Sequence, residues 1–579
     1  MAQRTAWLRR TYPVLFALFP ILALAAHNPG RYLARDVLIL CALSGVAVVL
    51  AVATVVTLMG ARRRNDRNEA ADVAALIVFS GVVLFYGYPM MRSIFVRAAA
   101  GMRVAAASAY WSRGGARERD VFIALIVVLA LCSLVWWSVA RTARGAMTRV
   151  GSLVSAFAKQ SARPVGTALS GAGAMLVLSS LCQLGYVRLA DARTIANAPL
   201  MNDLRRPVAT HPVTTQGGPR APKRDIYVVI LDEYAAADVY RDRYGFDNTA
   251  FEDSLRALGF RIPQSVRSNY AVTLLSLTSL LNFAHARSLA DAVDSRSSDY
   301  GVAGYLIEHN RAARFLKAQG YRYVLFPSRE FTPTARSDVA DEVYDPEPGF
   351  DVARAAYGSE LIYQWVQSTP VASFERFFQS YTAIRSQYAM HTLDALTTVA
   401  VRPRGSPVFA VAHVLMPHWP YTVDSDCRPR PAASYNQADT SGLAAQVRCL
   451  NRLTLRTVRA LIARSATPPI IILQGDHGSQ ALHPFDNPPG ALTPDQARER
   501  FQPLGAYFLP DGGAAALPDS VSIVNVLRYV FAYYFGADLP PLPNTMFFSS
   551  WRSPYSMTRV TDDFRLEART RTASHARAR

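Results

Sequence analysis

Long apolar runs dominate the N-terminal third of the chain. Five stretches contain almost no charged residues: Thr11–Ala26, Val37–Gly60, Ala70–Met91, Val121–Ala140 and Gly166–Val187. An α-helix of about 20 residues spans the hydrocarbon core of a bilayer, which is about 30 Å thick. The pattern therefore predicts that residues 1–188 form an all-α transmembrane domain of about five helices.

Two of these N-terminal features leave alternatives open. The first run contains Ala23-Leu24-Ala25, a small-residue pattern that also occurs where signal peptides are cleaved. Prolines such as Pro13 and Pro20 are tolerated in membrane helices, so a retained span is favoured. The Arg-rich stretch Ile94–Trp111 fits either an interfacial or a re-entrant helix.

Charge predicts how these spans are oriented. The formal net charge is +19, and residues 1–224, with 27 basic and 8 acidic side chains, account for all of it. With a cytoplasmic N-terminus the inner loops hold 12 basic residues and the outer loops eight, the sense that the positive-inside rule favours. We therefore expect a multi-pass inner (cytoplasmic) membrane protein whose chain after residue 188 is extracytoplasmic. Topology and lipid contact explain this charge better than nucleic-acid binding does.

Polar segments flank the remaining part of the chain. Leu189–Arg224 loses the apolar periodicity and is rich in Pro, Thr, Gly and Arg, which predicts a linker. Ser550–Arg579 has seven Arg and no long apolar run, which predicts a basic, flexible tail. Residues 225–549 are left as one soluble domain.

The soluble domain has the pattern of an α/β fold. Asp225–Leu231 contains the continuous β-branched run IYVVIL, which predicts a strand buried on both faces. Further strands are predicted at Tyr321–Phe326, Pro407–Val414 and Pro469–Gln474, with helices at Ala303–Gln319 and Leu443–Ala466 between them. Such alternation is typical of a mostly parallel sheet with helices on both faces. Sites in these sheets form beyond the carboxyl ends of the strands, so the residues after each strand are the candidates for chemistry.

Acidic residues and histidines follow three of these strands. Asp232 and Glu233 come after the first, the segment from His413 to His418 ends the third, and Asp476-His477 follows the fourth. Carboxylate oxygens and imidazole nitrogens suit Zn²⁺ or Mn²⁺, with Mg²⁺ or Ca²⁺ as alternatives. Each motif also has a structural interpretation, such as a helix cap for an Asp at a strand end.

Cysteines are few. Cys41, Cys132 and Cys182 lie in the predicted spans, where small apolar packing is the simplest role. Cys427 and Cys449 lie in the soluble domain, and an oxidising compartment permits a disulfide between them. Two buried thiols are the alternative.

Four segments taken together resemble the sulfatase-like branch of the alkaline phosphatase superfamily. They are VVILDEY at 228–234, SNYAVTLLSLTSLLN at 268–282, HVLMPHWPY at 413–421 and QGDHG at 474–478. The combination is most similar to membrane-anchored members, the lipoteichoic acid synthases and phosphoethanolamine transferases. The resemblance implies an alkaline-phosphatase-like domain outside the membrane, in the periplasm or cell envelope, behind a membrane anchor.

The resemblance also implies roles for single residues. Asp232, Asp476 and His477 match metal ligands, and Thr273 matches the nucleophile that also contacts the metal. His418 matches a histidine that binds the substrate or assists the leaving group. Substrate-contact roles are expected for three further residues, which are Asn269, Arg267 and His413. Glu233 adjoins Asp232, so either carboxylate is a candidate ligand.

The expected activity follows from the same resemblance. It implies a metal-dependent phosphotransferase that moves a phosphorylated group from a membrane lipid to an envelope glycan or lipid through a phosphothreonine-type intermediate. Hydrolysis of phosphate or sulfate esters is the alternative, although the sequence that matures to formylglycine in true sulfatases is absent. An inactive assembly factor is a third interpretation, against which the intact Asp, Thr and Asp-His set argues.

Overall fold

The computed structural model describes ten stretches of the chain. They are residues 8–58, 64–91, 144–212, 223–328, 331–344, 359–371, 381–401, 405–430, 437–482 and 492–567. The described chain divides into two compact units. One holds most of residues 1–187 together with Val352–Ser380, and the other holds Arg188–Asp351, Tyr381–Arg579 and the short Pro29–Arg31.

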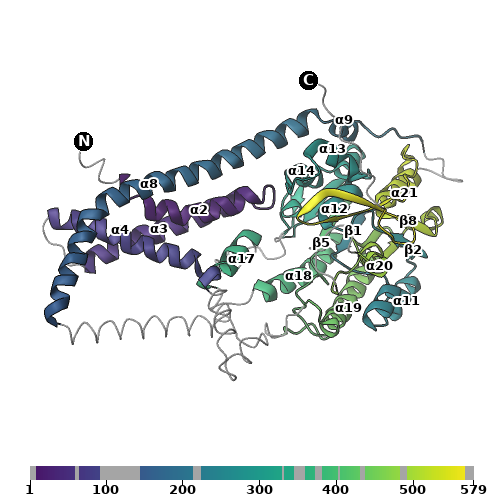
Figure 1. Cartoon of the computed structure of the whole chain (residues 1–579). Coiled ribbons are helices and arrows are strands. Elements are labelled where there is room, and N and C mark those ends of the chain that lie inside the picture. The colour runs from purple at the N-terminus through teal and green to yellow at the C-terminus, as the bar shows by residue number, and fades with distance from the viewer. Residues whose placement is uncertain are drawn as a thin grey trace. The chain divides into compact units, whose positions relative to one another are not determined.

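The described residues of the first unit form helices and the short turns between them (Figure 1). Its N-terminal helices are α2 (Tyr12–His27), α3 (Ala34–Leu58), α4 (Arg64–Tyr86) and most of α8 (Arg144–Asn197). Two helices, Ala34–Leu58 and Arg163–Asn197, are long and apolar enough to cross a membrane, while Tyr12–His27 and Ala70–Tyr86 are shorter apolar helices. Four predicted spans thus coincide with helices. Val121–Ala140 and Ile94–Trp111 lie outside the described residues, so the count of five remains a prediction.

A segment from the middle of the sequence also belongs to this helical unit. Helix α17 (Glu360–Gln367) hydrogen-bonds to it twice: Trp365 Nε1 donates to Tyr86 Oη at 3.1 Å, and Tyr32 Oη donates to Gln364 Oε1 at 2.5 Å. The prediction that residues 225–549 form one continuous domain is therefore wrong at this insertion. An eight-residue amphipathic helix gives no sequence signal of which unit its apolar face contacts.

The second unit is built on a six-stranded sheet, in the order β4-β3-β5-β1-β6-β7. The strands are β1 (Ile226–Leu231), β3 (Arg322–Phe326), β4 (Glu342–Val343), β5 (Val408–Val414), β6 (Ile470–Gly475) and β7 (Gly505–Phe508). All neighbours are parallel except β7, which is antiparallel to β6. The four predicted strands are confirmed, and the fold is the expected α/β arrangement.

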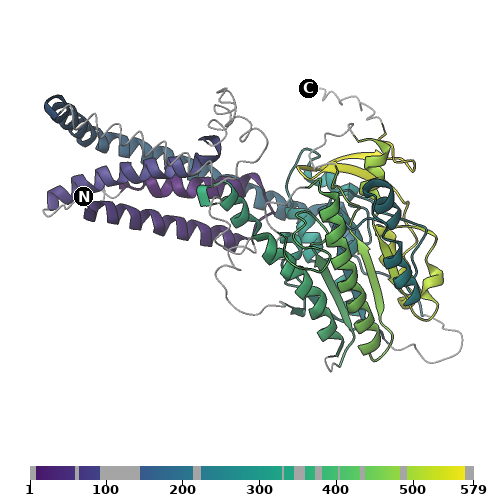
Figure 2. The same ribbon diagram turned by 90° about the horizontal axis from the view of Figure 1, so that it is seen from below.

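Helices cover both faces of the sheet because the strands are buried on both sides. One face packs against α12 (Thr273–Asn282), α14 (Gly301–Glu308), α15 (Arg311–Ala318) and α21 (Ile523–Phe535). The other packs against α10 (Ala237–Tyr244), α11 (Thr249–Ala257), α18 (Tyr381–Val401) and α19 (Thr440–Arg464). Helices α18 and α19 run side by side (Figure 2).

The remaining elements are short. They are α9 (Pro199–Arg205), α13 (Leu289–Val293), α20 (Pro494–Phe501), β2 (Ser265–Arg267), β8 (Ser520–Ser522), β9 (Met546–Ser550), β10 (Ser553–Val560), and the 3₁₀ turns η1 (Ala286–Ser288), η2 (Thr332–Thr334) and η5 (Gly513–Ala516). The predicted helix Ala303–Gln319 is two helices, since Asn310 caps α15 by accepting from Ala313 N–H at 2.7 Å. A side-chain cap of this kind starts a new helix inside an apparently continuous apolar pattern.

Two predicted flexible segments carry regular structure. Within the expected linker Leu189–Arg224, α8 continues to Asn197 and α9 follows, with Pro199 at its first turn. Within the expected tail Ser550–Arg579, β10 pairs with β9 and buries Tyr555 and Val560. The sequence did not indicate these elements, because the apolar residues in them are few and stand among arginines. Residues 213–222 and 568–579 lie outside the described residues, so the expectation for them stays a prediction.

Candidate active site

The strand register brings the chemistry-bearing segments to one edge of the sheet. Leu231, the last residue of β1, pairs with Val414 of β5 on one side and with Gly475 of β6 on the other. Because the three strands are parallel and end in line, the residues that follow them emerge together. Asp232 and Asp476 are the residues that follow β1 and β6.

The Asp476-His477 turn is held by backbone-directed hydrogen bonds. The hydroxyls of Ser268 and Ser276 both donate to Asp476 O, the first at 2.9 Å, and Glu233 N–H donates to Asp476 Oδ1 at 3.1 Å. Asp476 and His477 are fully buried. This turn therefore has little freedom, because two serine hydroxyls fix its main chain and one backbone N–H orients its carboxylate.

Gly478 lets the turn pack tightly against α20. Its N–H donates to Arg500 O at 2.7 Å, and a Cβ at this position would lie 2.0 Å from Glu499 O. No side chain fits at that separation, so the glycine that follows Asp476-His477 is a steric requirement.

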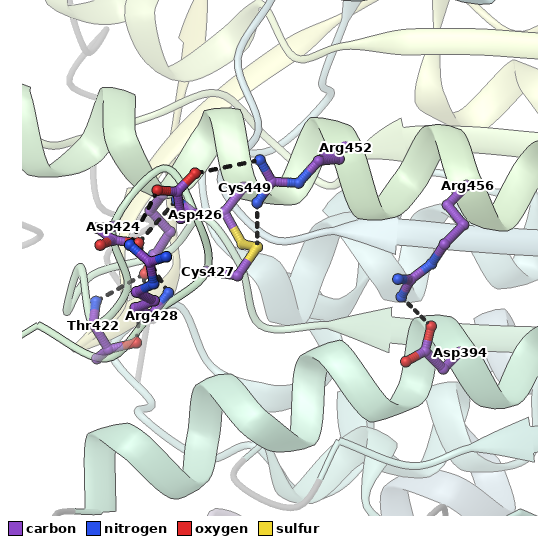
Figure 3. The surroundings of a disulfide bond; sticks show 10 residues. Asp394, Thr422, Asp424, Asp426, Cys427, Arg428, Cys449, Arg452 and Arg456 are labelled. Carbon is purple, nitrogen blue, oxygen red and sulfur yellow. Dashed lines mark hydrogen bonds and ion pairs between the residues drawn. A yellow bond between two sulfur atoms is a disulfide. The ribbon is translucent and has the colours of Figure 1, made fainter.

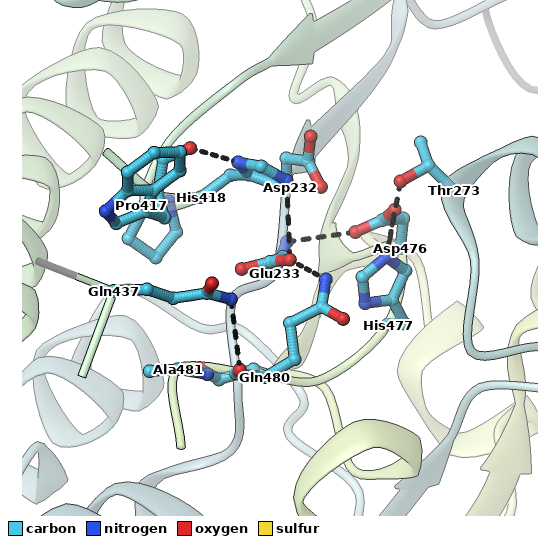
Figure 4. A network of polar contacts seen from close by, with 12 residues as sticks. Asp232, Glu233, Thr273, Pro417, His418, Gln437, Asp476, His477, Gln480 and Ala481 are labelled. Carbon is cyan, nitrogen blue, oxygen red and sulfur yellow. Dashed lines mark hydrogen bonds and ion pairs between the residues drawn. The ribbon is translucent and has the colours of Figure 1, made fainter. Parts of the chain in front are cut away.

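Thr273 is the first residue of α12 and lies against His477 (Figure 4). Thr273 Oγ1 is 3.2 Å from His477 Nε2, while His477 Nδ1 is 2.9 Å from Gly478 O. A carbonyl oxygen only accepts, so Nδ1 carries the proton and Nε2 presents a lone pair towards Thr273. The hydroxyl also lies at the positive end of a helix dipole, where an alkoxide or a phosphoryl group is stabilised.

Three buried side chains form a group suited to a cation. Ligand atoms of Asp232, His413 and Asp476 all lie within 4.8 Å of one another. His413 Nδ1 is 3.2 Å from Thr334 Oγ1, which itself donates to Phe331 O, so Nδ1 is the donor and Nε2 turns its lone pair towards the carboxylates. His413 Nε2 is 3.6 Å from Asp232 Oδ2. Two carboxylates and an imidazole lone pair repel one another unless a cation or protons lie between them.

The structure distinguishes the two adjacent carboxylates after β1. Asp232 faces His413 and Asp476, whereas Glu233, whose backbone φ is +63°, turns its side chain towards Gln480 and His418. Gln480 donates to Glu233 Oε1, and His418 Nε2 is 3.4 Å from the same oxygen. Burial raises the pKa of Glu233 to about 7. Glu233 therefore belongs to the surroundings of His418.

His418 is the more exposed histidine of the site, with 21% of its side chain accessible. The main-chain N–H of His418 donates to Asp232 O at 3.1 Å, and Gln446 Nε2 donates to the neighbouring Pro417 O at 3.1 Å. The main chain of the segment is thus fixed to β1 and α19, and the imidazole remains accessible for proton transfer or substrate contact.

Two predicted substrate-contact residues hold chain segments together. Asn269 Nδ2 donates to Thr545 O at 2.8 Å, and its Oδ1 accepts from Val524 N–H at 2.9 Å. The Arg267 guanidinium stacks on Phe564, with 4.4 Å from Cζ to the ring centre, and burial lowers its pKa. Their contact with substrate remains a prediction, as does that of His413.

Four further residues were not singled out by sequence reasoning. Ser268 and Ser276 bind Asp476 O, Thr334 sets the tautomer of His413, and Gln480 donates to Glu233. Ser268 and Ser276 lie in the segment 268–282 that carries the family resemblance, and their closeness to Thr273 in the sequence could have marked them as site residues. Thr334 and Gln480 have no pattern in the sequence that marks them.

Cys427 and Cys449 form a disulfide (Figure 3), as favoured from the sequence. It links the loop after β5 to α19. Arg430 and Asp439 support the same junction, because Arg430 Nη2 donates to Asp439 Oδ2 at 2.6 Å while Asp439 Oδ1 accepts from Gly442 N–H at 2.8 Å at the start of α19. The loop that carries His418 is thereby also fixed to α19 at its far end.

Part of the second unit is similar to a known protein family. Residues 224–501 match the model of the sulfatase family. No curated protein matches the sequence significantly.

Several solved structures are similar. The C-terminal periplasmic domain of EcEptC from Escherichia coli, in complex with Zn, is 13% identical, covers 61% of this chain and 96% of its own, and gives a TM-score of 0.39. The corresponding domain of the phosphoethanolamine transferase EptC from Campylobacter jejuni is 9% identical, with coverages of 55% and 91% and a TM-score of 0.34. A phosphonate monoester hydrolase of Agrobacterium radiobacter is 10% identical, with coverages of 56% and 80% and a TM-score of 0.35.

Proposed function

We propose that this protein, whose residues 224–501 match the sulfatase family model, is a metal-dependent phosphotransferase that acts on ester bonds. It transfers a phosphorylated group from a lipid head group to an envelope glycan or lipid. The observation that carries the proposal is the placement of Thr273 Oγ1 3.2 Å from His477 Nε2, beside the carboxylate pair of Asp232 and Asp476. A hydroxyl at a helix N-terminus next to ligands for a cation suits nucleophilic attack on phosphorus.

The donor set fits a divalent cation. Asp232, Asp476 and His477, with Thr273, are the residues expected to hold it, and His413 lies where it adds a further nitrogen. Mixed nitrogen and oxygen donors suit Zn²⁺ or Mn²⁺. When bound, such an ion polarises a phosphoryl oxygen and lowers the pKa of a hydroxyl beside it.

The chain's own residues account for the transfer steps. Thr273 Oγ1 attacks phosphorus, the new O–P bond forms, and the bond to the leaving alcohol breaks to give a phosphothreonine. His418, whose imidazole is accessible, gives a proton to the leaving oxygen. An acceptor hydroxyl then attacks the same phosphorus and loses its proton to His418. The bond from phosphorus to Thr273 Oγ1 breaks, and this oxygen takes back from water the proton that it gave to water in the first attack.

The predicted topology supports a lipid donor. Apolar helices precede the catalytic domain, and the charge pattern favours placing that domain outside the cytoplasm. Such a site has access to lipid head groups, whereas nucleoside triphosphates are confined to the cytoplasm. We therefore propose a multi-pass inner-membrane enzyme with membrane lipids and envelope acceptors as its partners.

Hydrolysis is the second candidate function. The match to the sulfatase family model favours it, because the same nucleophile and cation hydrolyse an ester when water replaces the acceptor. Product analysis separates the two: transfer yields a modified acceptor, whereas hydrolysis yields the free phosphorylated group.

A trapped intermediate tests the mechanism. Full-length protein incubated with Mn²⁺ or Zn²⁺ and membrane lipids is expected to yield a peptide phosphorylated at Thr273, detected by mass spectrometry. Thr273→Ala should abolish the adduct and turnover. Thr440→Ala is the matched control, since Thr440 is also the first residue of a helix, α19. Full turnover by Thr273→Ala would refute the nucleophile.

A further inference from the structure

A second group of charged side chains lies in the helical unit. Asp72 of α4 is 6% exposed and is contacted by Arg9 and Arg10, which precede α2, and by Arg163 of α8. Figure 1 shows the three helices from which they come. We call these four residues the arginine cluster.

The contacts converge on a single carboxylate. Arg9 donates from Nε to Asp72 Oδ1 at 3.3 Å and from Nη2 to Oδ2 at 3.1 Å, a two-pronged contact. Arg10 Nε donates to Oδ1 at 2.5 Å, and its Nη2 donates to Asn68 O at 2.8 Å. Arg163 Nε is 3.7 Å from Oδ2. Three guanidinium groups therefore share one acid among the described residues, so these four side chains carry a net charge of +2.

Arg163 is the part of the cluster that is open to a ligand. Its side chain is 58% exposed, against 23% for Arg9 and 19% for Arg10. Among the described residues, Asp72 is its one acidic partner. A planar guanidinium held at one end by a carboxylate presents its remaining N–H groups as a fork, the geometry that suits a phosphate.

Close helix packing fixes the arginines in place. A Cβ on Gly166 of α8 would lie 2.8 Å from Arg9 O, and one on Gly173 would lie 2.9 Å from Leu15 Cβ. These glycines let the backbones of α8 and α2 approach closely, as small residues do between membrane helices. Arg9 and Arg163 consequently both lie within 4 Å of Asp72 Oδ2 without needing a ligand to bring them together.

The cluster also lies at a single membrane boundary. Arg9 and Arg10 immediately precede the predicted span Thr11–Ala26, Asp72 is at the start of Ala70–Met91, and Arg163 precedes Gly166–Val187. In the predicted topology all of these ends are cytoplasmic, where anionic lipids concentrate and basic pockets between membrane helices bind their head groups.

We propose that the arginine cluster binds the phosphate of an anionic phospholipid in the cytoplasmic leaflet. This site is separate from the catalytic one and does not depend on the activity assigned to Thr273. The shared chemistry is a phosphate group, which a soluble phosphate of the cytoplasm also offers, and the excess charge and the membrane boundary favour the lipid.

Lipid binding to the purified full-length protein tests this proposal. The protein in neutral detergent is titrated with phosphatidylglycerol or with zwitterionic phosphatidylcholine, and bound lipid is counted by native mass spectrometry. We expect preferential binding of phosphatidylglycerol. Arg163→Gln should weaken it about fivefold, the factor equivalent to about 1 kcal/mol for one basic residue at a membrane surface. Arg35→Gln is the matched control, because Arg35 is 76% exposed in the same unit but outside the cluster.

A second variant separates binding from structural ion pairing. Asp72→Asn raises the uncompensated charge of the cluster, so phosphatidylglycerol binding is expected to stay at least as strong as in the wild type. If Asp72→Asn does not fold, Arg163→Gln decides. Equal binding of the two lipids, or equal loss in Arg163→Gln and Arg35→Gln, would overturn the proposal. Displacement of the lipid by millimolar inorganic phosphate would reassign the cluster to a soluble anion and overturn the lipid assignment.

Discussion

At the scale of single residues, two histidines of the site have their tautomers set by ordinary neighbours. Gly478 O accepts from His477 Nδ1–H, and Thr334 Oγ1 accepts from His413 Nδ1–H. In each ring the other nitrogen, Nε2, presents a lone pair towards the site. A hydrogen bond donated by one ring nitrogen orients a histidine and makes its other nitrogen a stronger metal ligand.

His413 gives a testable consequence of this arrangement. His413→Ala removes one donor from the group with Asp232 and Asp476, so metal affinity should fall about 10- to 100-fold, the range seen when groups that support a metal site are removed. Metal content after dialysis against a chelator series, read by elemental mass spectrometry, measures this. His285→Ala is the control, because His285 contacts Pro543 O away from the site. Unchanged metal retention in His413→Ala would exclude it as a donor.

At the scale of elements, the junction between the loop after β5 and α19 decides how firmly His418 is held. The Cys427–Cys449 disulfide crosses this junction, and Asp439 contributes both a helix cap and an ion pair with Arg430. Burial alone would raise the pKa of Asp439, but the hydrogen bonds from Arg430, Ser441 and Gly442 outweigh it and lower the pKa to about 2.

Asp439 should therefore stabilise the catalytic domain in a pH-dependent way. Its pKa is lower in the folded state than the ordinary value of 3.8 for an aspartate, so its contribution is complete above about pH 4 and is lost as the pH falls through about 2. Asp439→Ala is expected to lower the free energy of unfolding by about 1 kcal/mol at pH 7, the usual worth of a helix cap. Denaturant unfolding at pH 7, 4 and 3 measures the difference.

Asp439→Asn is the matched control, because asparagine keeps a capping oxygen and loses the charge. It should retain most of the stability at pH 7 and show less pH dependence than the wild type. A difference between wild type and Asp439→Ala that is the same at pH 7 and pH 3 would contradict a contribution from the ionised carboxylate.

At the scale of the whole molecule, the two units differ in how far their apolar side chains are exposed. Helix α3 exposes large apolar side chains, among them Leu38 at 70% and Leu50 at 61%. The strands β1, β5 and β6 of the second unit are buried throughout. Exposed leucines at this density suit lipid contact, while the second unit has the core of an independently folded domain.

Cysteine labelling in intact cells tests the predicted topology. Glu567→Cys, at an exposed position of the second unit, is expected to react with a membrane-impermeant maleimide. Asn68→Cys, at an exposed position near the start of α4, should react only after the cells are permeabilised. Labelling of both without permeabilisation would mean that the orientation inferred from the arginines is wrong.

The sequence by itself determined the sheet strands and the chemistry that follows them. β1, β5 and β6 are short, largely apolar runs that contain valine or isoleucine, and such runs are typical of strands buried on both faces. Thr273, Asp476 and His477 could be proposed as site residues from the sequence because each motif is local along the chain. The parallel sheet then required the ends of the strands to meet at one edge.

Only the tertiary structure decided contacts between distant segments. It turned Asp232 towards His413 and Asp476, turned Glu233 towards His418, and attached α17 to the helical unit. These outcomes depend on strand register and on which face of a short helix is covered, and neither leaves a periodic trace in the sequence. The net charge of +19 likewise did not predict the ion pair between Arg163 and Asp72, because that pair depends on how the helices pack.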